Sequence, residues 1–451
     1  MINRRILDEL EKWSKSKNRK PLILRGARQV GKTTAVEMFA KKFDQFIHLN
    51  LDKKPDLALF ENNDFNKLLD SIFYVNGMNK DKKNTLIFID EIQNSPEAVA
   101  YLRYFYENTP DLYVISAGSL LESVFNVKIS FPVGRCEYLK MHPVTFREFL
   151  EALKETQSID LIDNCEFPEY AHNKLTDLFC DYTLTGGMPE AVKVYIETKD
   201  RIEVNRVYES LIISYLDDIE KYSDNPNFSR VISHTLKSTF KTAGQRITFE
   251  GFGNANYKSR EIGEALRLLE KAMLIKLAYP STDINYPFEE NHRRKPRLHI
   301  VDTGLLNYFS GIQQEMFLSR NITDGRLGRI YEHITGQELM AKSFSPLHNV
   351  SFWVREKNQS NAELDYLYQH NGKAYPIEVK SGKTGTLKSL HQFIDETGIT
   401  EAVRLYSGKF SVETASTIKG NKFRLMNLPF YAIPSLEKLI EKEFNSNNIL
   451  S

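Results

Sequence analysis

A glycine-rich segment near the start of the chain has residue types and a spacing that suit phosphate binding. Residues 26–33 read Gly-Ala-Arg-Gln-Val-Gly-Lys-Thr, which fits the pattern G-x-x-x-x-G-K-[ST]. In such a loop the backbone N–H groups surround the phosphates, and the N-terminus of the following helix adds partial positive charge. Lys32 would reach the β- and γ-phosphates of ATP and act in catalysis, and Thr33 would offer its hydroxyl to Mg²⁺. The residues expected to bind ATP are Gly26, Ala27, Arg28, Gln29, Val30, Gly31, Lys32, Thr33 and Thr34.

Two acidic residues after a later apolar run could complete this site. Residues 86–89 read Leu-Ile-Phe-Ile, and Asp90 and Glu91 follow them. A carboxylate at the end of a buried strand can hold Mg²⁺, and we expect this role of Asp90. Glu91 would orient or deprotonate the attacking water as a general base. The alternative is a strand that ends in two solvated acids.

Two further polar residues are candidates for contact with the transferred phosphoryl group. Ser119, in a Gly-Ser pair after an apolar run at 112–115, could touch the γ-phosphate or the attacking water, and Ser116 is the second choice. Arg135 follows a turn at Gly134, and a guanidinium there could offset charge that develops on the phosphoryl group. The alternatives are a simple turn for Ser119 and a surface position for Arg135.

A second group of charged residues lies near the C-terminus. Asp365 and Glu378 fall on two successive strand-like segments, and alternation along the second strand puts Glu378 and Lys380 on one face. Two carboxylates with a backbone carbonyl suit a hard divalent cation, and Glu332 on a preceding helix could add a ligand. Lys380 could stabilise developing negative charge as a catalytic residue. The alternative is an edge strand with a Glu–Lys salt bridge.

The elements that must position these residues fall into three regions. Apolar runs at 22–24, 46–49, 86–89 and 112–115 alternate with helical stretches, which predicts a parallel sheet with helices on both faces. Helices dominate from about residue 143 to residue 222, with a break at residues 186–189, Gly-Gly-Met-Pro. Beyond residue 320 we expect a second α/β region, with a helix at 326–342 and strands at 351–355, 363–368, 374–379, 402–406 and 423–427.

The region between about 203 and 310 predicts a winged helix, because helical stretches precede a pair of strands at 274–278 and 297–301. Lys258 and Arg260 begin the helix that would take the recognition position, and residues 293–295 read Arg-Arg-Lys in the intervening loop. Such groups can contact DNA phosphates and bases. The alternative is a solvated helix face inside an ATPase lid.

The composition limits the kinds of partner. The chain has 451 residues, with 60 Lys plus Arg against 59 Asp plus Glu, a formal charge of +1 that excludes a globally basic nucleic-acid coat protein. Its three cysteines predict no disulfide framework, and no apolar stretch is typical of a secretory signal or a membrane span. We therefore expect a cytoplasmic protein without a membrane partner.

The ATP-site motifs, with residues 186–189, resemble those of AAA-type ATPases of prokaryotes related to archaeal STAND-like ATPases. This resemblance implies a five-stranded core of the AAA+-like, ASCE class, with Glu91 as catalytic glutamate, Ser119 as sensor and Arg135 as the arginine. Residues 302–305, Asp-Thr-Gly-Leu, also resemble this group. The order Glu332, Asp365, Glu378, Lys380 resembles the PD-(D/E)XK nuclease core of the archaeal Holliday-junction resolvase type, although Leu364 stands where that family has a proline.

The expected fold class is α/β, with a P-loop ATPase and helical lid (1–200), a winged helix (201–315) and a restriction-endonuclease-like domain (316–451). Two functions fit these patterns. The first is an ATP-hydrolysing protein that acts on DNA with a nuclease-like domain. The second is an ATP-driven regulatory switch that binds a protein partner and carries an inactive nuclease-like domain. A salt bridge of Lys380 in place of an open metal site would favour the switch. The patterns leave open the oligomeric state and whether Arg135 acts on its own subunit's nucleotide or a neighbour's.

Overall fold

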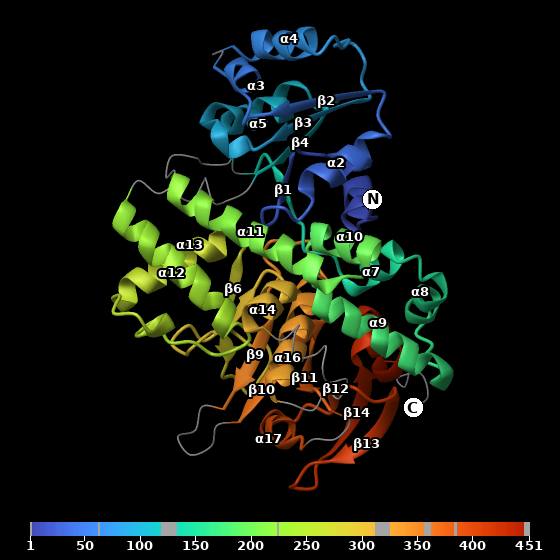
Figure 1. Cartoon of the computed structure of the whole chain (residues 1–451). Coiled ribbons are helices and arrows are strands. Elements are labelled where there is room, and N and C mark those ends of the chain that lie inside the picture. The colour runs from blue at the N-terminus through green and yellow to red at the C-terminus, as the bar shows by residue number, and fades with distance from the viewer. Residues whose placement is uncertain are drawn as a thin grey trace.

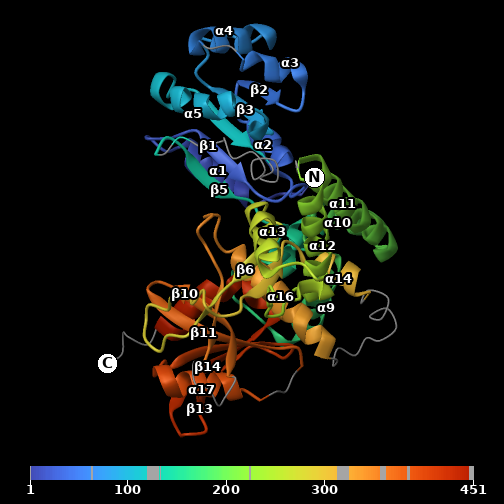
Figure 2. The ribbon, with the colours of Figure 1, turned by 90° about the vertical axis from the view of Figure 1, so that its left-hand side faces the viewer.

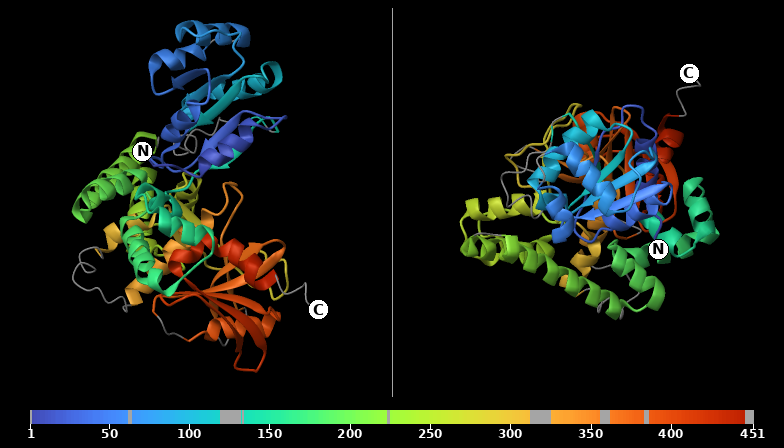
Figure 3. Two further views of the ribbon diagram at one scale, coloured as in Figure 1. Left: turned by 90° about the vertical axis from the view of Figure 1, so that its right-hand side faces the viewer. Right: turned by 90° about the horizontal axis from the view of Figure 1, so that it is seen from above.

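The computed structural model describes residues 2–61, 64–118, 132, 134–222, 225–311, 325–355, 362–382 and 386–445. Figure 1 shows a sheet with its helices at the top, a layer of helices in the middle and a larger sheet at the bottom. The two side views in Figures 2 and 3 agree that the middle helices lie between the two sheets. No helix within the described ranges is long and apolar enough to cross a membrane.

The N-terminal sheet is entirely parallel and has the strand order β2-β3-β4-β1-β5. The strands are β1 (Leu22–Arg25), β2 (Gln45–Asn50), β3 (Thr85–Asp90), β4 (Tyr113–Ala117) and β5 (Glu137–Lys140). The predicted parallel sheet is confirmed, and four of its strands lie where the apolar runs predicted them. The apolar runs did not predict β5, because Glu-Tyr-Leu-Lys lacks one and every residue of the strand is only half-buried.

Both faces of this sheet are covered, because alternate side chains of each strand enter different cores. On β3, Leu86 and Phe88 pack with α1 and α2, whereas Ile87 and Ile89 pack with α4 and α5. The helices of this part are α1 (Ile6–Ser14), α2 (Lys32–Ala40), α3 (Lys54–Leu59), α4 (Phe65–Val75) and α5 (Pro96–Asn108). A strand buried on both faces explains the continuous apolar run that precedes Asp90.

The middle layer is helical and ends in a small antiparallel pair of strands. Its helices are α7 (Phe146–Ala152), α8 (Thr156–Asp163), α9 (His172–Thr185), α10 (Pro189–Thr198), α11 (Arg201–Tyr222), α12 (Pro226–Thr242), α13 (Ser259–Lys271) and α14 (Thr303–Ser310). Strands β6 (Ile275–Ala278) and β8 (Arg297–Ile300) pair with each other. Three helices followed by two strands match the element order expected of a winged helix, which itself stays a prediction.

The C-terminal sheet is mixed, with the order β13-β14-β12-β11-β10-β9-β7. Its elements are β7 (Pro280–Ser281), α16 (Gly325–Met340), β9 (Ser351–Val354), β10 (Glu363–His370), β11 (Lys373–Lys380), α17 (Lys388–Thr397), β12 (Glu401–Tyr406), β13 (Ser411–Ser416), β14 (Lys422–Pro429) and α18 (Leu436–Ile440). Because β7 pairs with β9, the edge strand of this sheet comes from the loop between β6 and β8, ahead of the boundary expected near residue 315.

One continuous apolar core joins the middle helices to the C-terminal sheet. Leu298 of β8, Ile334 of α16 and Val403 of β12 belong to it, and all three are fully buried. The two cores of the N-terminal sheet are separate from this one. Apolar contacts between these cores and the remainder include Phe344, which packs against the core formed by α1 and α2.

Candidate nucleotide site

The phosphate-binding pattern forms the turn between β1 and α2, as the motif requires. Gln29 and Gly31 have positive φ values of 62° and 95°, so the chain turns sharply before Lys32 begins the helix. A Cβ on Gly26 would lie 2.8 Å from the carbonyl oxygen of Met141, so only glycine fits this close approach of two backbones. The loop therefore places backbone N–H groups and a helix N-terminus where phosphates can bind.

Lys32, Thr33 and Asp90 meet at the carboxyl end of the sheet. Lys32 Nζ donates to the carbonyl oxygens of Gly26 and Ala27 at 3.0 and 3.1 Å. Thr33 Oγ1 donates to Asp90 Oδ2 at 2.7 Å, which brings together the two oxygens predicted to serve Mg²⁺. Burial lowers the pKa of the Lys32 ammonium, and the carboxylates of Glu91 and Asp90 oppose that shift. Hard oxygen donors of this kind fit Mg²⁺, whose bound form would neutralise charge on the phosphates.

Glu91 is oriented by a residue that the sequence did not single out. It has a left-handed backbone with a φ of 52°, and Gln93 Nε2 donates to Glu91 Oε2 at 2.6 Å. Gln93 is buried, and a Cβ on Gly118 would lie 1.9 Å from Gln93 Oε1. The glycine after β4 thus leaves room for the amide that holds the predicted general base.

Arg135, the predicted arginine, does not join this group, and neither does Ser116, the second choice for the sensor. Ser119 lies outside the described residues. Ser116 is fully buried inside β4, where its hydroxyl lies 3.4 Å from the Leu22 carbonyl oxygen. Arg135 Nε donates to Glu107 Oε1 at 3.0 Å, at the end of α5, so its side chain is engaged by a helix of its own domain. The roles predicted for Ser119 and Arg135 stay predictions.

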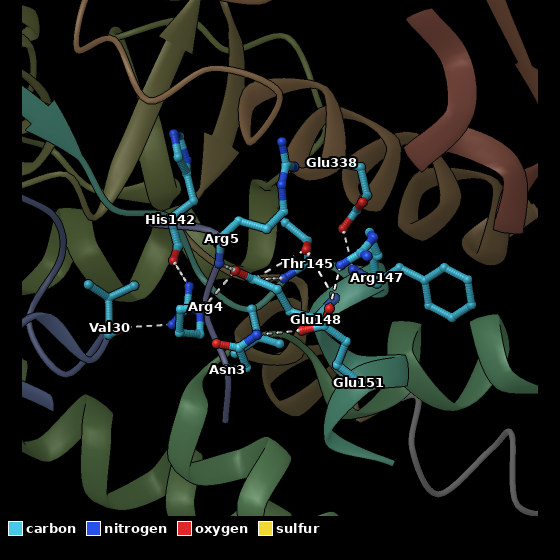
Figure 4. A network of polar contacts seen from close by, with 12 residues as sticks. Asn3, Arg4, Arg5, Val30, His142, Thr145, Arg147, Glu148, Glu151 and Glu338 are labelled. Atoms are coloured by element: carbon cyan, nitrogen blue, oxygen red, sulfur yellow. Dashed lines mark hydrogen bonds and ion pairs between the residues drawn. The ribbon is translucent and has the colours of Figure 1, made fainter. Parts of the chain in front are cut away.

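A buried arginine near the start of the chain supports the loop from behind (Figure 4). Arg4 donates from Nη1 to the Val30 carbonyl at 3.0 Å and from Nη2 to the His142 carbonyl at 2.5 Å, and it pairs with Glu148 at 3.2 Å. Glu148 also accepts from the Thr145 backbone in a capping box at the start of α7. This network fixes the phosphate loop to the middle helices.

A pocket of about 570 Å³ opens beside the loop and extends the site. Gly31 and Thr34 form one wall, Ile2 of the N-terminal segment a second, and Pro189 and Lys193 of α10 a third. The walls are largely apolar, which suits a planar base next to a phosphate loop. The pocket places the Gly-Gly-Met-Pro segment directly against the candidate ATP site.

The carboxylate of Asp302 holds that segment in place. Its Oδ2 accepts from the backbone N of Gly187 at 2.5 Å and lies 3.4 Å from Gln337 Nε2. Its Oδ1 accepts from Tyr208 Oη and from Gly304 N, at 2.7 and 2.9 Å. Burial raises the pKa of this carboxyl, and the four donors oppose the shift. The Asp-Thr-Gly motif thus has a structural partner 115 residues earlier in the chain.

The C-terminal carboxylates lie together, with cations already engaged. Lys380 Nζ donates to Glu378 Oε1 at 2.6 Å, and the backbone N of Val379 donates to Asp365 Oδ2 at 2.8 Å. Burial, with the neighbouring Asp365 carboxylate, raises the pKa of Glu332 to about 7 and that of Glu378 to about 8.

The buried guanidinium of Arg297, from β8, faces the same group. It donates to the Asp365 carbonyl at 2.7 Å and to the Glu363 carboxylate, and its Nη2 lies 3.8 Å from Asp365 Oδ1. Within the described ranges, no three His, Cys, Asp or Glu side chains are arranged to hold a metal ion. The donor set does not fit a divalent cation in this arrangement, and the metal roles of Glu332, Asp365 and Glu378 stay predictions.

Comparisons with known protein families match three successive regions of the chain. Residues 18–150 match a family model described as "AAA domain". This range holds the phosphate-binding loop, Asp90 and Glu91, so it is similar to a P-loop ATPase domain in both motif and fold. Residues 176–316 and 327–431 match two models described as domains of unknown function, DUF8612 and DUF4143.

Relatives and solved structures resemble parts of the chain. Two uncharacterized proteins, from Mycobacterium bovis and Mycobacterium tuberculosis, are each 28% identical over 131 residues, a match that spans 29% of this chain and 28% of each relative. A Walker-type ATPase of Pyrococcus abyssi is 15% identical with a TM-score of 0.45, over 69% of this chain and 96% of that one. The ORC1 protein of Aeropyrum pernix in complex with DNA is 11% identical with a TM-score of 0.30, over 70% and 92% of the chains.

Proposed function

We propose that this protein binds and hydrolyses ATP and works as a nucleotide-driven switch that acts on a protein partner. The observation that carries the proposal is that Lys32, Thr33, Asp90 and Glu91 lie together at the carboxyl end of the N-terminal sheet. The loop beside them is hydrogen-bonded to the middle helices. Lys32 would bind the phosphates, and Glu91, oriented by Gln93, would accept a proton from the attacking water. Bound Mg²⁺ would supply charge neutralisation at Thr33 and Asp90.

The switch is supported by contacts that lead from the ATP site into the other layers. Arg4 joins the loop to Glu148 of α7, and the backbone N of Phe146 on that helix donates to Glu338 of α16 at 3.0 Å. Asp302 joins residue 187 to α14. If a bound nucleotide moved the loop, the hydrogen bonds that link it through α7 and residue 187 to α16 and α14 would also change. A switch requires contacts of this kind that differ between the nucleotide-bound and nucleotide-free states.

The test uses ATP binding, turnover and hydrogen exchange together. Lys32→Ala should abolish ATP binding or turnover, and normal turnover in this variant would overturn the site assignment. In the unsubstituted protein, ATP with Mg²⁺ should change amide exchange in α11 and α16 as well as at residues 26–34. Exchange that changes only at the loop would leave an ATPase without the switch.

A second candidate function, DNA binding, rests on an exposed basic surface. Lys258, Arg260 and Arg267 lie exposed at and along α13, and residues 293–295 are exposed as well. The positive charge of Arg267 on α13 is close enough to Tyr279 to oppose the rise in the pKa of that tyrosine. The ring of Tyr279 in turn lies 4.3 Å from the ring of His292, next to residues 293–295, so the helix and the loop are neighbours.

Fluorescence anisotropy with duplex DNA tests this candidate. Arg267→Ala should weaken binding and lower the salt slope by about 1, whereas the exposed Arg206→Ala should not. Equal binding by all three proteins, or none, would remove DNA from the proposal. Cleavage by the C-terminal region stays a prediction, for which Asp365→Ala with Mg²⁺ and branched DNA is the test.

A further inference from the structure

A cavity of about 190 Å³ lies where the three layers meet. Lys140 of β5 lines it from the N-terminal sheet, Glu270 and Lys276 from α13 and β6, and Met340 from α16. Ala27 of the phosphate loop also lines it, whereas Gly31 of the same loop lines the pocket beside α10. The cavity is thus distinct from the ATP site and shares one loop with it.

The charges around this cavity do not balance through direct contacts. Lys276 Nζ lies 3.0 Å from Glu270 Oε1, and that same oxygen accepts from the backbone N of Leu277 at 3.0 Å. Among the residues that the structure describes, none bonds or pairs with Lys140 Nζ. Burial, with Lys276 as a further cause, lowers the pKa of Lys140 to about 8, so its ammonium is charged at pH 7 but poorly compensated.

His142 also lines the cavity and does not supply the missing negative charge. Its Nε2 lies 3.1 Å from the Ser343 carbonyl oxygen, and burial lowers the pKa of its imidazole well below the usual value. A neutral imidazole leaves two ammonium groups facing one carboxylate. Lys140 and Lys276 are both partly exposed, so an anion that enters from solvent can reach their ammonium groups.

We propose that this cavity binds a small dianion of the phosphate type between the ammonium groups of Lys140 and Lys276. The volume accommodates such an anion with water around it. The carbonyl of Ala27 accepts from Lys32 Nζ at 3.1 Å, so the occupant adjoins the back of the phosphate loop. The site therefore links a free anion to the loop that binds ATP.

Isothermal titration calorimetry with inorganic phosphate at constant ionic strength tests this proposal without ATP. Lys140→Met should weaken phosphate binding about tenfold or more, because one charge-assisted hydrogen bond is lost. Glu270→Gln should tighten it, because the competing carboxylate is removed while an acceptor for Leu277 N is kept. The exposed Lys271→Met, on the same helix as Glu270, is the matched control and should bind as the unsubstituted protein does.

Lys32→Ala separates this cavity from the phosphate loop, which also binds phosphate. Saturable binding that survives in Lys32→Ala and is lost in Lys140→Met supports the proposal, whether or not the protein hydrolyses ATP. Binding that is lost in Lys32→Ala and retained in Lys140→Met would assign the anion to the loop and overturn it, as would no binding at all. If Lys140→Met does not fold, Lys140→Gln takes its place, and a melting temperature that rises with phosphate in the unsubstituted protein but not in Lys140→Gln gives the same answer.

Discussion

Arg28 of the phosphate loop donates from Nη1 to both carboxylate oxygens of Asp218 on α11. Three residues earlier on that helix, the hydroxyl of Tyr215 donates to the Arg28 carbonyl at 3.4 Å. The side chain and the backbone of one loop residue are therefore both held by a helix of the middle layer. Asp218 is buried and Arg28 is partly exposed, so the pair is screened less than one at the surface.

Removal of the Asp218 charge should tighten ATP binding. Asp218→Asn leaves the Arg28 guanidinium without its carboxylate partner and removes a negative charge near the phosphates. An effect of about 0.5–1 kcal/mol, or two- to fivefold in Kd, is expected for a partly exposed pair. A fluorescent ATP analogue gives the measurement, and the exposed neighbour variant Asp217→Asn is the control. An unchanged Kd in Asp218→Asn would show that the loop does not sense this ion pair.

Gln93 should matter for turnover and little for ATP binding. Gln93→Ala removes the amide that orients Glu91 at 2.6 Å, so we expect kcat to fall about tenfold through misplacement of the base. The KM for ATP should stay within about twofold, because no predicted phosphate contact is lost. Asn94→Ala, on the same turn, removes a bond to Asp52 and serves as the control. A kcat equal to that of the control would contradict the orienting role.

Substitution of Gly187 tests whether residues 186–189, which adjoin the pocket beside the phosphate loop, tolerate a side chain at this position. A Cβ there would lie 2.5 Å from the carbonyl oxygen of Val144, which is backbone and cannot rotate away. Gly187→Ala should cost about 1–3 kcal/mol of unfolding free energy and weaken ATP binding. Gly328→Ala on α16 is the matched control, since its Cβ would meet only Ser381 Oγ at 3.9 Å. Urea unfolding of both variants decides the matter, and equal stability would refute the crowding argument.

His333 should make the protein less stable in mild acid. Its Nε2 accepts from the backbone N of Ile300 at 3.1 Å, so the buried ring is neutral, and burial lowers its pKa to about 3 from an ordinary 6.5. The unfolded chain takes up a proton below pH 6.5 that the folded chain refuses until about pH 3, so stability is lost as pH falls through this window. Between pH 7 and pH 4.5 the loss is about 2–3 kcal/mol from this residue.

Urea unfolding at both pH values checks that expectation against His333→Gln. The variant should be less stable at pH 7 and should lose less stability on acidification. The buried imidazole of His142 also has a lowered pKa and contributes equally to both proteins. His299 has a lowered pKa too, but His333 is one of its causes, so part of the change on substitution comes through His299. A pH dependence unchanged by the substitution would show that His333 does not carry this effect.

Local patterns predicted four strands of the N-terminal sheet, β1 to β4, because these strands carry apolar runs, but not the half-buried β5. They did not predict β13, whose six residues are mostly polar and exposed, or the two-residue β7. Both are edge strands, and an edge strand needs little apolar surface of its own. The strand order of either sheet likewise depends on contacts between distant segments.

The residues of the candidate site likewise include some that local sequence patterns predict and some that they do not. Lys32, Thr33, Asp90 and Glu91 could be predicted because the spacing of the loop and the end of a buried strand fix them locally. Arg4 and Asp302 could not, because each acts on backbone atoms more than 100 residues away, at His142 and Gly187 respectively. Gln93 carried a local signal that was missed: it follows the acidic pair by two residues and could reach back to Glu91.

Strand β7 has a consequence for how the layers can move. The chain leaves the small β6–β8 pair, adds two residues to the edge of the C-terminal sheet, and returns to the same pair. Arg297, the first residue of β8, is anchored to Glu363 on β10 of that sheet. The β6–β8 pair and the C-terminal sheet are therefore joined at two points, the β7–β9 pairing and the contact of Arg297 with Glu363, so we expect them to move together. A conformational change that begins at the candidate ATP site should therefore displace the β6–β8 pair and the C-terminal sheet together.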